Sequence, residues 1–362
     1  MKMPFVFDAH LDLALNALEW NRDLTQPLQD IRQRESHLSD KPDRGHGTVC
    51  LPEMRRARVG LCVATQIARV EHDQYSPVAG WRSQAQARAM TQGQLAWYRA
   101  MEESGEMISI RNVHDLDAHL EKWQQAEDAA AISRLPVGYI LSLEGADSLM
   151  TIHDLERSWN EGLRAVGPAH YGPGVYAQGT STEGPFPARG LELMREMDRL
   201  RMILDATHLS DDCFWQALDL YQGPIWASHH NSRSLVPHQR QLSAEMFRAL
   251  VARGAVVGLT FDAWMMTPGW ERRKTTPQSA NLHLEKIVEH LDHYCQLAGN
   301  ADHVGLGTDL DGAFGTEQTP MGLDSIADLQ KLPALLSSRG YSETDIDGIL
   351  HGNFIRFLRA AL

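Results

Sequence analysis

The feature that most constrains the fold is the alternation of short apolar runs with helical segments along the chain. Eight runs have the length of a strand, and most stretches between them space their apolar residues as a helix does. The runs begin at Phe5, Val59, Val137, Leu163, Met202, Ile225, Ala255 and Val304. Such alternation indicates a parallel sheet, and eight units are typical of a closed barrel. We therefore predict a single (β/α)8 TIM-type barrel with additional helices, of the α/β class.

Length and charge narrow the possibilities further. No repeat or flexible linker divides the 362 residues, so we expect one domain over residues 1–362. A formal net charge of −13 argues against nucleic acid or an anionic membrane as the main partner. The chain passes from Met1 directly into the first apolar run, and no run approaches the roughly 18 apolar residues of a membrane span. We expect a cytoplasmic protein whose 4 isolated cysteines are reduced.

Residue types that bind metals follow six of the eight runs. His10 and Asp12 come after the first run, and their spacing places both side chains on one face of an extended segment. The others, each after its own run, are Glu144, His170, His208, His229 and Asp309. The carboxyl ends of barrel strands form one open face, on which active sites are built. We therefore expect these side chains to converge at one mouth.

This mixture of imidazoles and carboxylates is typical of a zinc-type centre. A carboxylate has two oxygens, so Glu144 can bridge an ion held by His10 and Asp12 to another held by His208 and His229. Two ions about 3.5–4 Å apart can share a hydroxide and polarise a carbonyl, which is the machinery of hydrolysis. We predict two Zn²⁺ per chain, while other divalent ions suit the same donors.

Three more residues suggest roles beside the metals. Asp309 can carry a proton from the attacking water to the leaving amine, and the alternative is a further metal ligand. A neutral His170 can donate to the oxyanion or, alternatively, bond to loop backbone. Arg240 lies in the loop after His229, where a guanidinium can bind a substrate carboxylate, and Arg233 is the nearby competitor. We predict Asp309 and His170 as catalytic, and Arg240 and His170 as substrate-binding.

The motifs around these residues resemble those of the renal, or membrane, dipeptidase family of zinc metallopeptidases, a branch of the amidohydrolase-type barrels. The matching segments are DAHLDL at 8–13, SLEGA at 142–146, DATHLS at 205–210, ASHHNSR at 227–233, GLGTDLDG at 305–312 and GNF at 352–354. The resemblance implies hydrolysis of free dipeptides, including some with a D-residue at the carboxyl end. It also implies a homodimer, and the metal, substrate and proton-transfer roles given above.

The chain departs from the family pattern close to the expected substrate. Leu11 stands where a small polar residue is usual, residues 171–176 replace a polar run, and Gln241 replaces an asparagine. The loop from Asp262 to Ser279 is open to three interpretations: a lid, a dimer contact or plain packing. Two rival functions stay open as well. One is a barrel metallohydrolase of another amide or a lactone, such as an N-acyl amino acid, and the other is a non-catalytic peptide or amino-acid binding protein.

Overall fold

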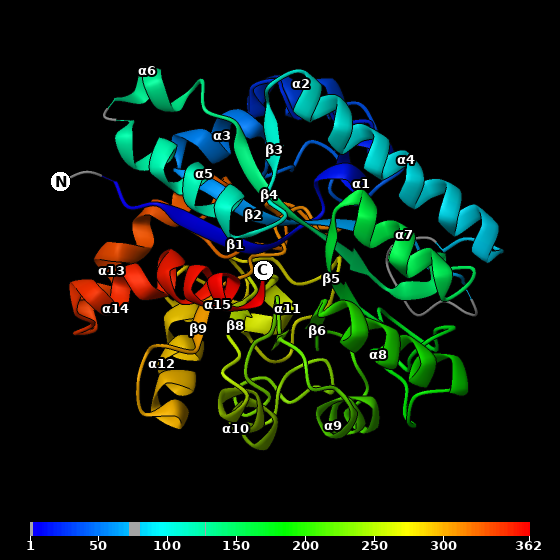
Figure 1. The fold of residues 1–362 in the computed structure, drawn as a ribbon. Helices are drawn as coiled ribbons and strands as arrows, with labels where there is room; N and C mark the ends of the chain where they lie inside the picture. The colour runs from blue at the N-terminus through cyan, green and yellow to red at the C-terminus, as the bar shows by residue number, and fades with distance from the viewer. Residues whose placement is uncertain (1–2, 72–79, 127) are drawn as a thin grey trace.

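The strands form one parallel sheet in the computed structural model, which describes residues 3–71, 80–126 and 128–362 (Figure 1). They are β1 (Val6–Leu11), β2 (Val59–Ile67), β3 (Met107–Ser109), β4 (Val137–Glu144), β5 (Leu163–Gly167), β6 (Ile203–Asp205), β7 (Ile225–Trp226), β8 (Val257–Leu259) and β9 (Val304–Leu306). Their order is β7-β6-β5-β4-β2-β1-β9-β8, with β3 paired to β4 beside this path. Ala227, just after β7, bridges to Val257 of β8 and brings the two ends together. The predicted TIM-type barrel is confirmed, and the barrel is nearly closed.

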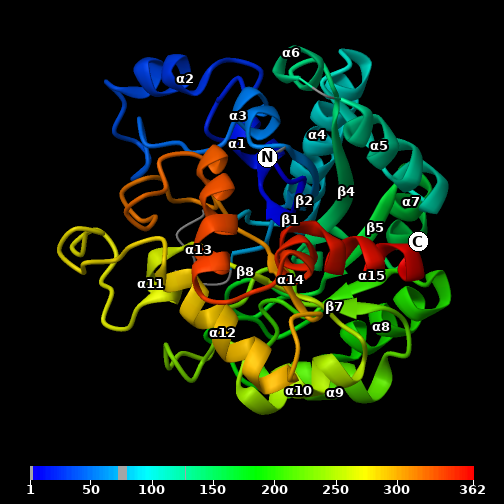
Figure 2. The ribbon, with the colours of Figure 1, turned by 90° about the vertical axis from the view of Figure 1, so that its left-hand side faces the viewer.

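Helices surround the strands, as Figure 2 shows in a view turned by 90°. The longer ones are α4 (Gln84–Glu103), α5 (Val113–Gln125), α7 (His153–Glu161), α8 (Ala188–Leu200), α9 (Asp211–Leu220), α10 (Ala244–Ala252), α12 (Lys286–Ala298) and α15 (Asn353–Ala361). The shorter ones are α1 (Leu13–Leu18), α2 (Leu28–Glu35), α3 (Leu51–Arg56), α6 (Ala129–Ile132), α11 (Ala263–Met266), α13 (Leu332–Ser338) and α14 (Glu343–Asp347). Short helices of other types lie at Ala146–Ser148, Ile326–Lys331 and Gly348–Gly352. Among the described residues, no helix is both long and apolar enough to cross a bilayer.

The first strand is longer than the sequence predicts. The apolar run suggests that it ends at Phe7, whereas β1 continues to Leu11 and all its residues are buried. The reason is pairing on both sides, because Leu11 lies opposite Ala64 of β2 and Asp8 lies opposite Leu306 of β9. Because β1 is paired with β2 as far as Leu11, His10 belongs to the strand itself rather than to the loop after it.

Helix α12 begins later than predicted. Helical spacing suggests a start at Ala280, but the helix starts at Lys286. Backbone bonds run from the Leu284 N–H to the Met321 carbonyl and from the Met321 N–H to the Leu282 carbonyl, so this segment is extended. A segment paired in this way cannot also form helical bonds. For α4, the helical spacing of residues 78–103 predicts a start at Val78, which lies outside the described residues, and the observed helix begins at Gln84.

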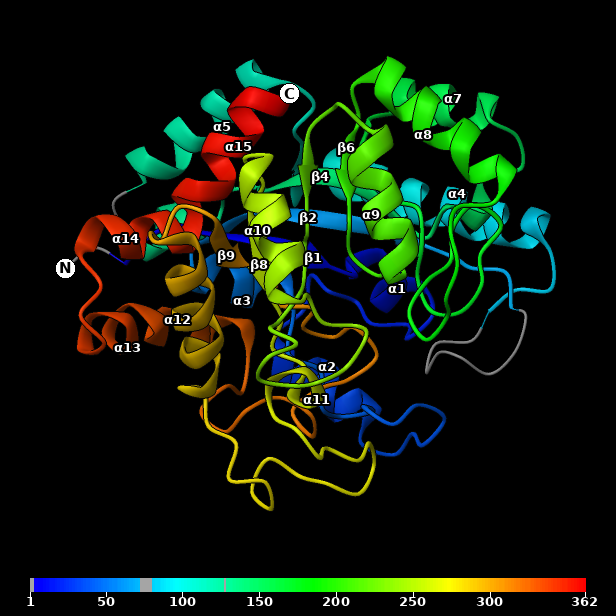
Figure 3. The same cartoon turned by 90° about the horizontal axis from the view of Figure 1, so that it is seen from below.

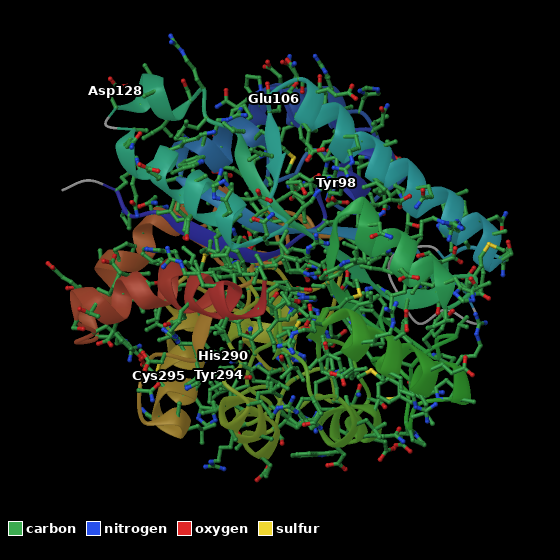
Figure 4. The ribbon with its side chains drawn as sticks, viewed as in Figure 1. Tyr98, Glu106, Asp128, His290, Tyr294 and Cys295 are labelled. Atoms are coloured by element: carbon green, nitrogen blue, oxygen red, sulfur yellow. The ribbon has the colours of Figure 1, made fainter. Side chains whose placement is uncertain are left out.

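Two helices carry buried polar side chains that bond to neighbouring segments, and Figure 4 labels Tyr98 of α4 and His290 of α12. The Tyr98 ring of α4 stacks on Tyr139 of β4, with centroids 5.1 Å apart, and its hydroxyl donates to the Thr65 carbonyl at 2.8 Å. On α12, His290 Nδ1 accepts from the Ser232 N–H at 3.1 Å, beyond β7. Seen from below in Figure 3, α12 and α10 lie next to each other, and Tyr294 of α12 stacks on Phe247 of α10 at 4.2 Å. Of these contacts, the one from His290 holds the loop after β7, which carries His229 and Arg240.

Candidate metal centre and substrate chamber

The metal-type side chains predicted from the sequence meet around Glu144, the last residue of β4. Its Oε2 lies 3.5 Å from His10 Nε2. Its Oε1 lies 3.3 Å from His208 Nε2 and 3.6 Å from His229 Nε2. The two oxygens of one carboxylate therefore face different sets of nitrogens. Asp12 completes the first set, with Oδ1 3.7 Å from His10 Nε2.

The donor atoms form three overlapping groups, and within each group all of them lie within 4.8 Å of one another. The groups are His10, Glu144 and His229; Glu144, His170 and His208; and His10, Asp12 and Asp309. Each group shares at least one residue with another. The donors thus surround a space in which a metal ion could bind.

The charges around this space fit a bound cation. In the described part of the chain, no Lys or Arg nitrogen lies within 4.0 Å of the carboxylates of Asp12, Glu144 and Asp309, whose ion-pair contacts are all with histidines. Burial and the Glu144 carboxylate raise the pKa of Asp12 to about 6. Burial and neighbouring carboxylates also raise the pKa of Asp309 well above its usual value. Among the described residues, buried His10 Nε2 has no hydrogen-bond partner. A divalent cation would neutralise the acids and engage this nitrogen.

The two histidines beyond Glu144 are held by hydroxyl groups. His208 Nδ1 lies 2.8 Å from Thr180 Oγ1, and His229 Nδ1 lies 2.9 Å from Ser228 Oγ. Burial, with positive charge nearby, holds the pKa of both imidazoles well below the usual value. A neutral imidazole whose Nδ1 donates to a hydroxyl presents the lone pair of Nε2, which is the form that binds a metal.

The backbone at the barrel mouth is shaped for these side chains. His208 and Asp309 have φ values of 68° and 59°, in the left-handed region that non-glycine residues rarely adopt. Such conformations cost about 1–3 kcal/mol each and cluster at functional sites. A Cβ at Gly258 or Gly307 would lie 1.9 Å or 1.7 Å from the Ser228 carbonyl oxygen. Only glycine therefore allows the chain that leads into His229 to pass so close to β8 and β9.

Asp8 ties the first strand to the last beside the metal donors. Its carboxylate accepts from the Thr308 N–H at 2.9 Å, from Thr308 Oγ1 at 2.6 Å and from the His10 N–H at 3.1 Å. Asp12 in turn accepts a short hydrogen bond from Thr65 Oγ1. These bonds orient His10, Asp12 and the segment leading to Asp309.

We expect Asp8→Ala to lower metal affinity by about 10–100-fold, the range for residues that orient metal ligands. Competition with a fluorescent chelator measures the effect, and the exposed Asp30→Ala on α2 serves as the control. An Asp8→Ala variant that binds metal as tightly as the parent would show that these hydrogen bonds do not shape the centre.

Arg240 lies buried beside the donors, and residues 3–71, 80–126 and 128–362 offer it no acidic partner. One of its terminal nitrogens donates to His230 Nδ1 at 3.2 Å, and the other donates to the His229 carbonyl at 3.0 Å. No described residue forms a hydrogen bond with its Nε, and no described carboxylate lies within 4.0 Å of its nitrogens. Arg233, by contrast, pairs with Asp211 through bonds of 2.7 and 2.8 Å. Of the two arginines proposed from the sequence, Arg240 is the one positioned to receive an anion.

His170 lies three residues beyond β5, against His208, with ring centroids 4.6 Å apart. Its Nδ1 is buried and has no hydrogen-bond partner in the part of the chain that the structure describes. Burial lowers the pKa of the imidazole to about 4, so the ring is neutral at physiological pH. A neutral ring can donate one hydrogen bond and accept another, or bind a cation.

Two spaces adjoin these residues. An inner chamber of about 30 Å³ is lined by Arg240 and by the metal-type residues other than His10. A cavity of about 1080 Å³, which we call the vestibule, shares Tyr171 and Arg272 with the chamber. Its other lining residues include Trp264, Trp270 and residues 272–276 from the loop Asp262–Ser279, whose role the sequence left open.

Two charged residues of the chamber, Asp262 and Arg272, are not among the site residues predicted from the sequence. Asp262 directly follows the apolar run from Ala255, just as the predicted metal-type residues follow theirs, so the same pattern could have identified it. Arg272 lies ten residues further along in the long loop and bonds to Asp262 Oδ2 at 3.1 Å. No local pattern marks such a residue.

Comparison with known proteins gives a consistent result. The family described as membrane dipeptidase (peptidase family M19) matches residues 1–362. Dipeptidase tcpJ of Claviceps purpurea is 30% identical over 251 residues, which are 66% of this chain and 55% of that protein. Dipeptidase verJ of Clonostachys rogersoniana is 29% identical over 229 residues, 61% of this chain and 55% of that protein. The matches to these two relatives thus span about half of their length.

Solved structures share the fold. A dipeptidase AC, a metallopeptidase of family M19, superposes with a TM-score of 0.78 at 23% identity, covering 99% of both chains. A metallopeptidase from Rhodobacter sphaeroides, liganded with a phosphinate mimic of the dipeptide L-Ala-D-Ala, gives a TM-score of 0.77 at 21% identity over the full length of both chains. At these identities the likeness establishes the barrel fold.

Proposed function

The chain belongs to the membrane dipeptidase family, peptidase family M19, and from this membership and the site geometry we propose that it hydrolyses the peptide bond of free dipeptides. The observation that carries the proposal is the position of Glu144. One of its oxygens faces His10 and the other faces His208 and His229. A bridging carboxylate between two ligand sets is the arrangement of two-metal hydrolases.

The proposed centre holds two Zn²⁺, although other borderline divalent ions suit the same donors. His10 and Asp12 would hold one ion, His208 and His229 the other, and Glu144 would contact both. When bound, such a pair polarises the scissile carbonyl and lowers the pKa of a water. The ligands are buried, so bulk water is excluded and electrostatic interactions at the centre are strengthened.

The remaining side chains would carry out the proton transfers and hold the substrate. Asp309, whose pKa is raised, accepts the proton of the attacking water and delivers it to the nitrogen of the leaving amine as the C–N bond breaks. Neutral His170 donates to the carbonyl oxygen as charge develops on it. Arg240 binds the terminal carboxylate of the dipeptide in two-pronged fashion.

Arg240 provides a specific test of substrate recognition. We expect Arg240→Ala to raise KM for a free dipeptide by about 10–100-fold, because a charge-assisted contact is lost. The same variant should change hydrolysis of the C-terminally amidated analogue little, since that substrate has no terminal carboxylate. Steady-state kinetics on the two substrates measures both effects. Equal losses on the free and amidated forms would contradict the role of Arg240 as a carboxylate-binding residue.

A substrate panel tests the activity itself. The metal-loaded protein is assayed on L-Xaa-L-Xaa and L-Xaa-D-Xaa dipeptides, N-acetyl amino acids and a lactone. Dipeptide hydrolysis as the main activity supports the proposal, with the D-residue series defining stereochemistry. Hydrolysis confined to N-acetyl amino acids or the lactone would replace it with the rival hydrolase, and tight binding without turnover would favour a binding protein. Assembly as a homodimer stays a prediction that light scattering can test.

A further inference from the structure

The inner chamber is too small to contain a whole dipeptide. It measures about 30 Å³, whereas sites for small ligands typically measure about 300–1,000 Å³. The vestibule, at about 1080 Å³, adjoins it through Tyr171 and Arg272. A substrate whose scissile bond reaches Glu144 must therefore place part of its structure in the vestibule. The chemistry of the vestibule walls then influences which side chains are accepted.

The vestibule is cationic although the chain as a whole is acidic. Its walls carry four cationic side chains and two acidic ones, against a net charge of −13 for the protein. The cationic ones are Lys41, Arg272, Arg273 and Lys274, and the acidic ones are Asp40 and Glu317. A local excess of positive charge favours an anionic ligand group.

The two acids do little to offset this charge. Asp40 pairs with Arg44 at 2.9 Å. Glu317 accepts from the Gly315 N–H, and burial raises the pKa of this carboxyl to about 7, so part of its population is neutral at physiological pH. Among the cations, Lys274 pairs with Glu271 at 2.8 Å. Lys41 and Arg273 have no carboxylate partner within 4.0 Å in the described part of the chain.

Arg272 is the cation nearest to the metal donors, because it lines both the chamber and the vestibule. One N–H bonds to Asp262 Oδ2 at 3.1 Å, and the other oxygen of Asp262 accepts from Gln318 Nε2 at 2.7 Å. The guanidinium lies 5.5 Å from the Trp264 ring centroid. A guanidinium has five N–H groups, and no other described residue accepts from this one, whose side chain is 34% exposed. Arg272 is thus held in place, and its remaining N–H groups can donate hydrogen bonds to a ligand.

We infer that the vestibule selects dipeptides with an acidic side chain, and that Arg272 binds the side-chain carboxylate. The inference rests on the proposed function, in which Arg240 takes the terminal carboxylate. Arg272 would act as a specificity-determining residue that touches the substrate away from the scissile bond. Lys41 and Arg273 would add to the attraction without a fixed contact.

Matched substrates test the inference on the metal-loaded enzyme. Ala-Asp, Asp-Ala, Ala-Glu and Glu-Ala are compared with the same dipeptides in which Asn or Gln replaces the acid, so that size is kept and charge removed. We expect kcat/KM for the best acidic dipeptide to exceed that of its Asn or Gln analogue by at least about tenfold. This is the factor expected from one charge-assisted hydrogen bond. Arg272→Gln should reduce this ratio to within about twofold of unity, while Arg272→Lys should keep most of it.

Controls separate the inference from folding and from the proposed function. Lys122→Gln, on the exposed face of α5, should leave the ratio unchanged. Arg272 forms an ion pair with the buried Asp262, so losing Arg272 alone would leave a buried carboxylate unpaired. The double variant Asp262→Asn/Arg272→Gln removes both charges, and the acid-to-amide ratio of kcat/KM should fall in this variant too. A parent enzyme that cleaves amide dipeptides as well as acidic ones would overturn the inference alone, as would a ratio unchanged in both Arg272→Gln variants. An enzyme that cleaves no dipeptide would overturn the proposed function as well.

Discussion

Replacing Glu144 by glutamine should abolish most of the activity and remove bound metal. We expect kcat/KM on a free dipeptide to fall by at least about 10³-fold, comparable with losing a principal electrostatic contact of the transition state. Metal content should fall to one ion per chain or fewer. The amide offers one oxygen in place of two, and its NH₂ group would face either His10 or the pair His208 and His229.

Assay of kcat/KM and metal analysis on the same Glu144→Gln preparation measure both effects. Glu245→Gln on the surface of α10 is the matched control and should behave as the parent. Circular dichroism of both variants shows whether the barrel persists. A Glu144→Gln protein that keeps two ions would contradict the bridging role, even if its activity were low.

Asp309→Asn should have a large effect of another kind. We expect kcat to fall by about 10²–10⁴-fold, the usual contribution of general acid–base catalysis, while KM and metal content stay close to those of the parent. Asparagine can occupy the same space but cannot carry the proton to the leaving amine. It also tolerates the left-handed backbone that residue 309 adopts at a φ of 59°, so the substitution adds little strain.

The metal content of Asp309→Asn separates the two roles considered for this residue. Asp309 Oδ1 lies 3.8 Å from His10 Nε2, close enough for either a proton carrier or a ligand. Loss of one ion per chain in this variant would identify Asp309 as a ligand and refute its assignment as the proton carrier. Comparing Asp309→Asn with Glu144→Gln at equal zinc concentration makes the distinction direct.

The sequence predicted the barrel and the seven converging side chains because both follow from one rule. Apolar runs that alternate with helices give parallel strands, and the residues after those runs must share a face. Applied to every run, the same rule would also have identified Asp262, which follows Ala255–Phe261. The boundaries of β1 and α12 differ because partners distant in sequence set them: Leu306 opposite Asp8, and Met321 against residues 282–284.

Near the proposed substrate site, the sequence could not show which distant residues pair with each other. The sequence places Arg233 and Arg240 in the same loop, so it cannot show which of them binds the substrate carboxylate. The structure distinguishes them, because Arg233 forms an ion pair with Asp211 of α9. Arg272 and the vestibule arise from a long loop with no periodic pattern, so charge and residue type alone could not place them beside Glu144. The distribution of charge between chamber and vestibule emerges only when the loop is folded over the barrel mouth.

The measurement that tests the central claim most directly is the metal content of the purified, unchelated protein by inductively coupled plasma mass spectrometry. The arrangement around Glu144 predicts about two zinc-type ions per chain. Removal of the ions by a chelator should abolish dipeptide hydrolysis, and added Zn²⁺ should restore it. A protein that contains no metal, binds none when zinc is supplied and still cleaves dipeptides would contradict the claim that these residues form a two-metal hydrolytic centre.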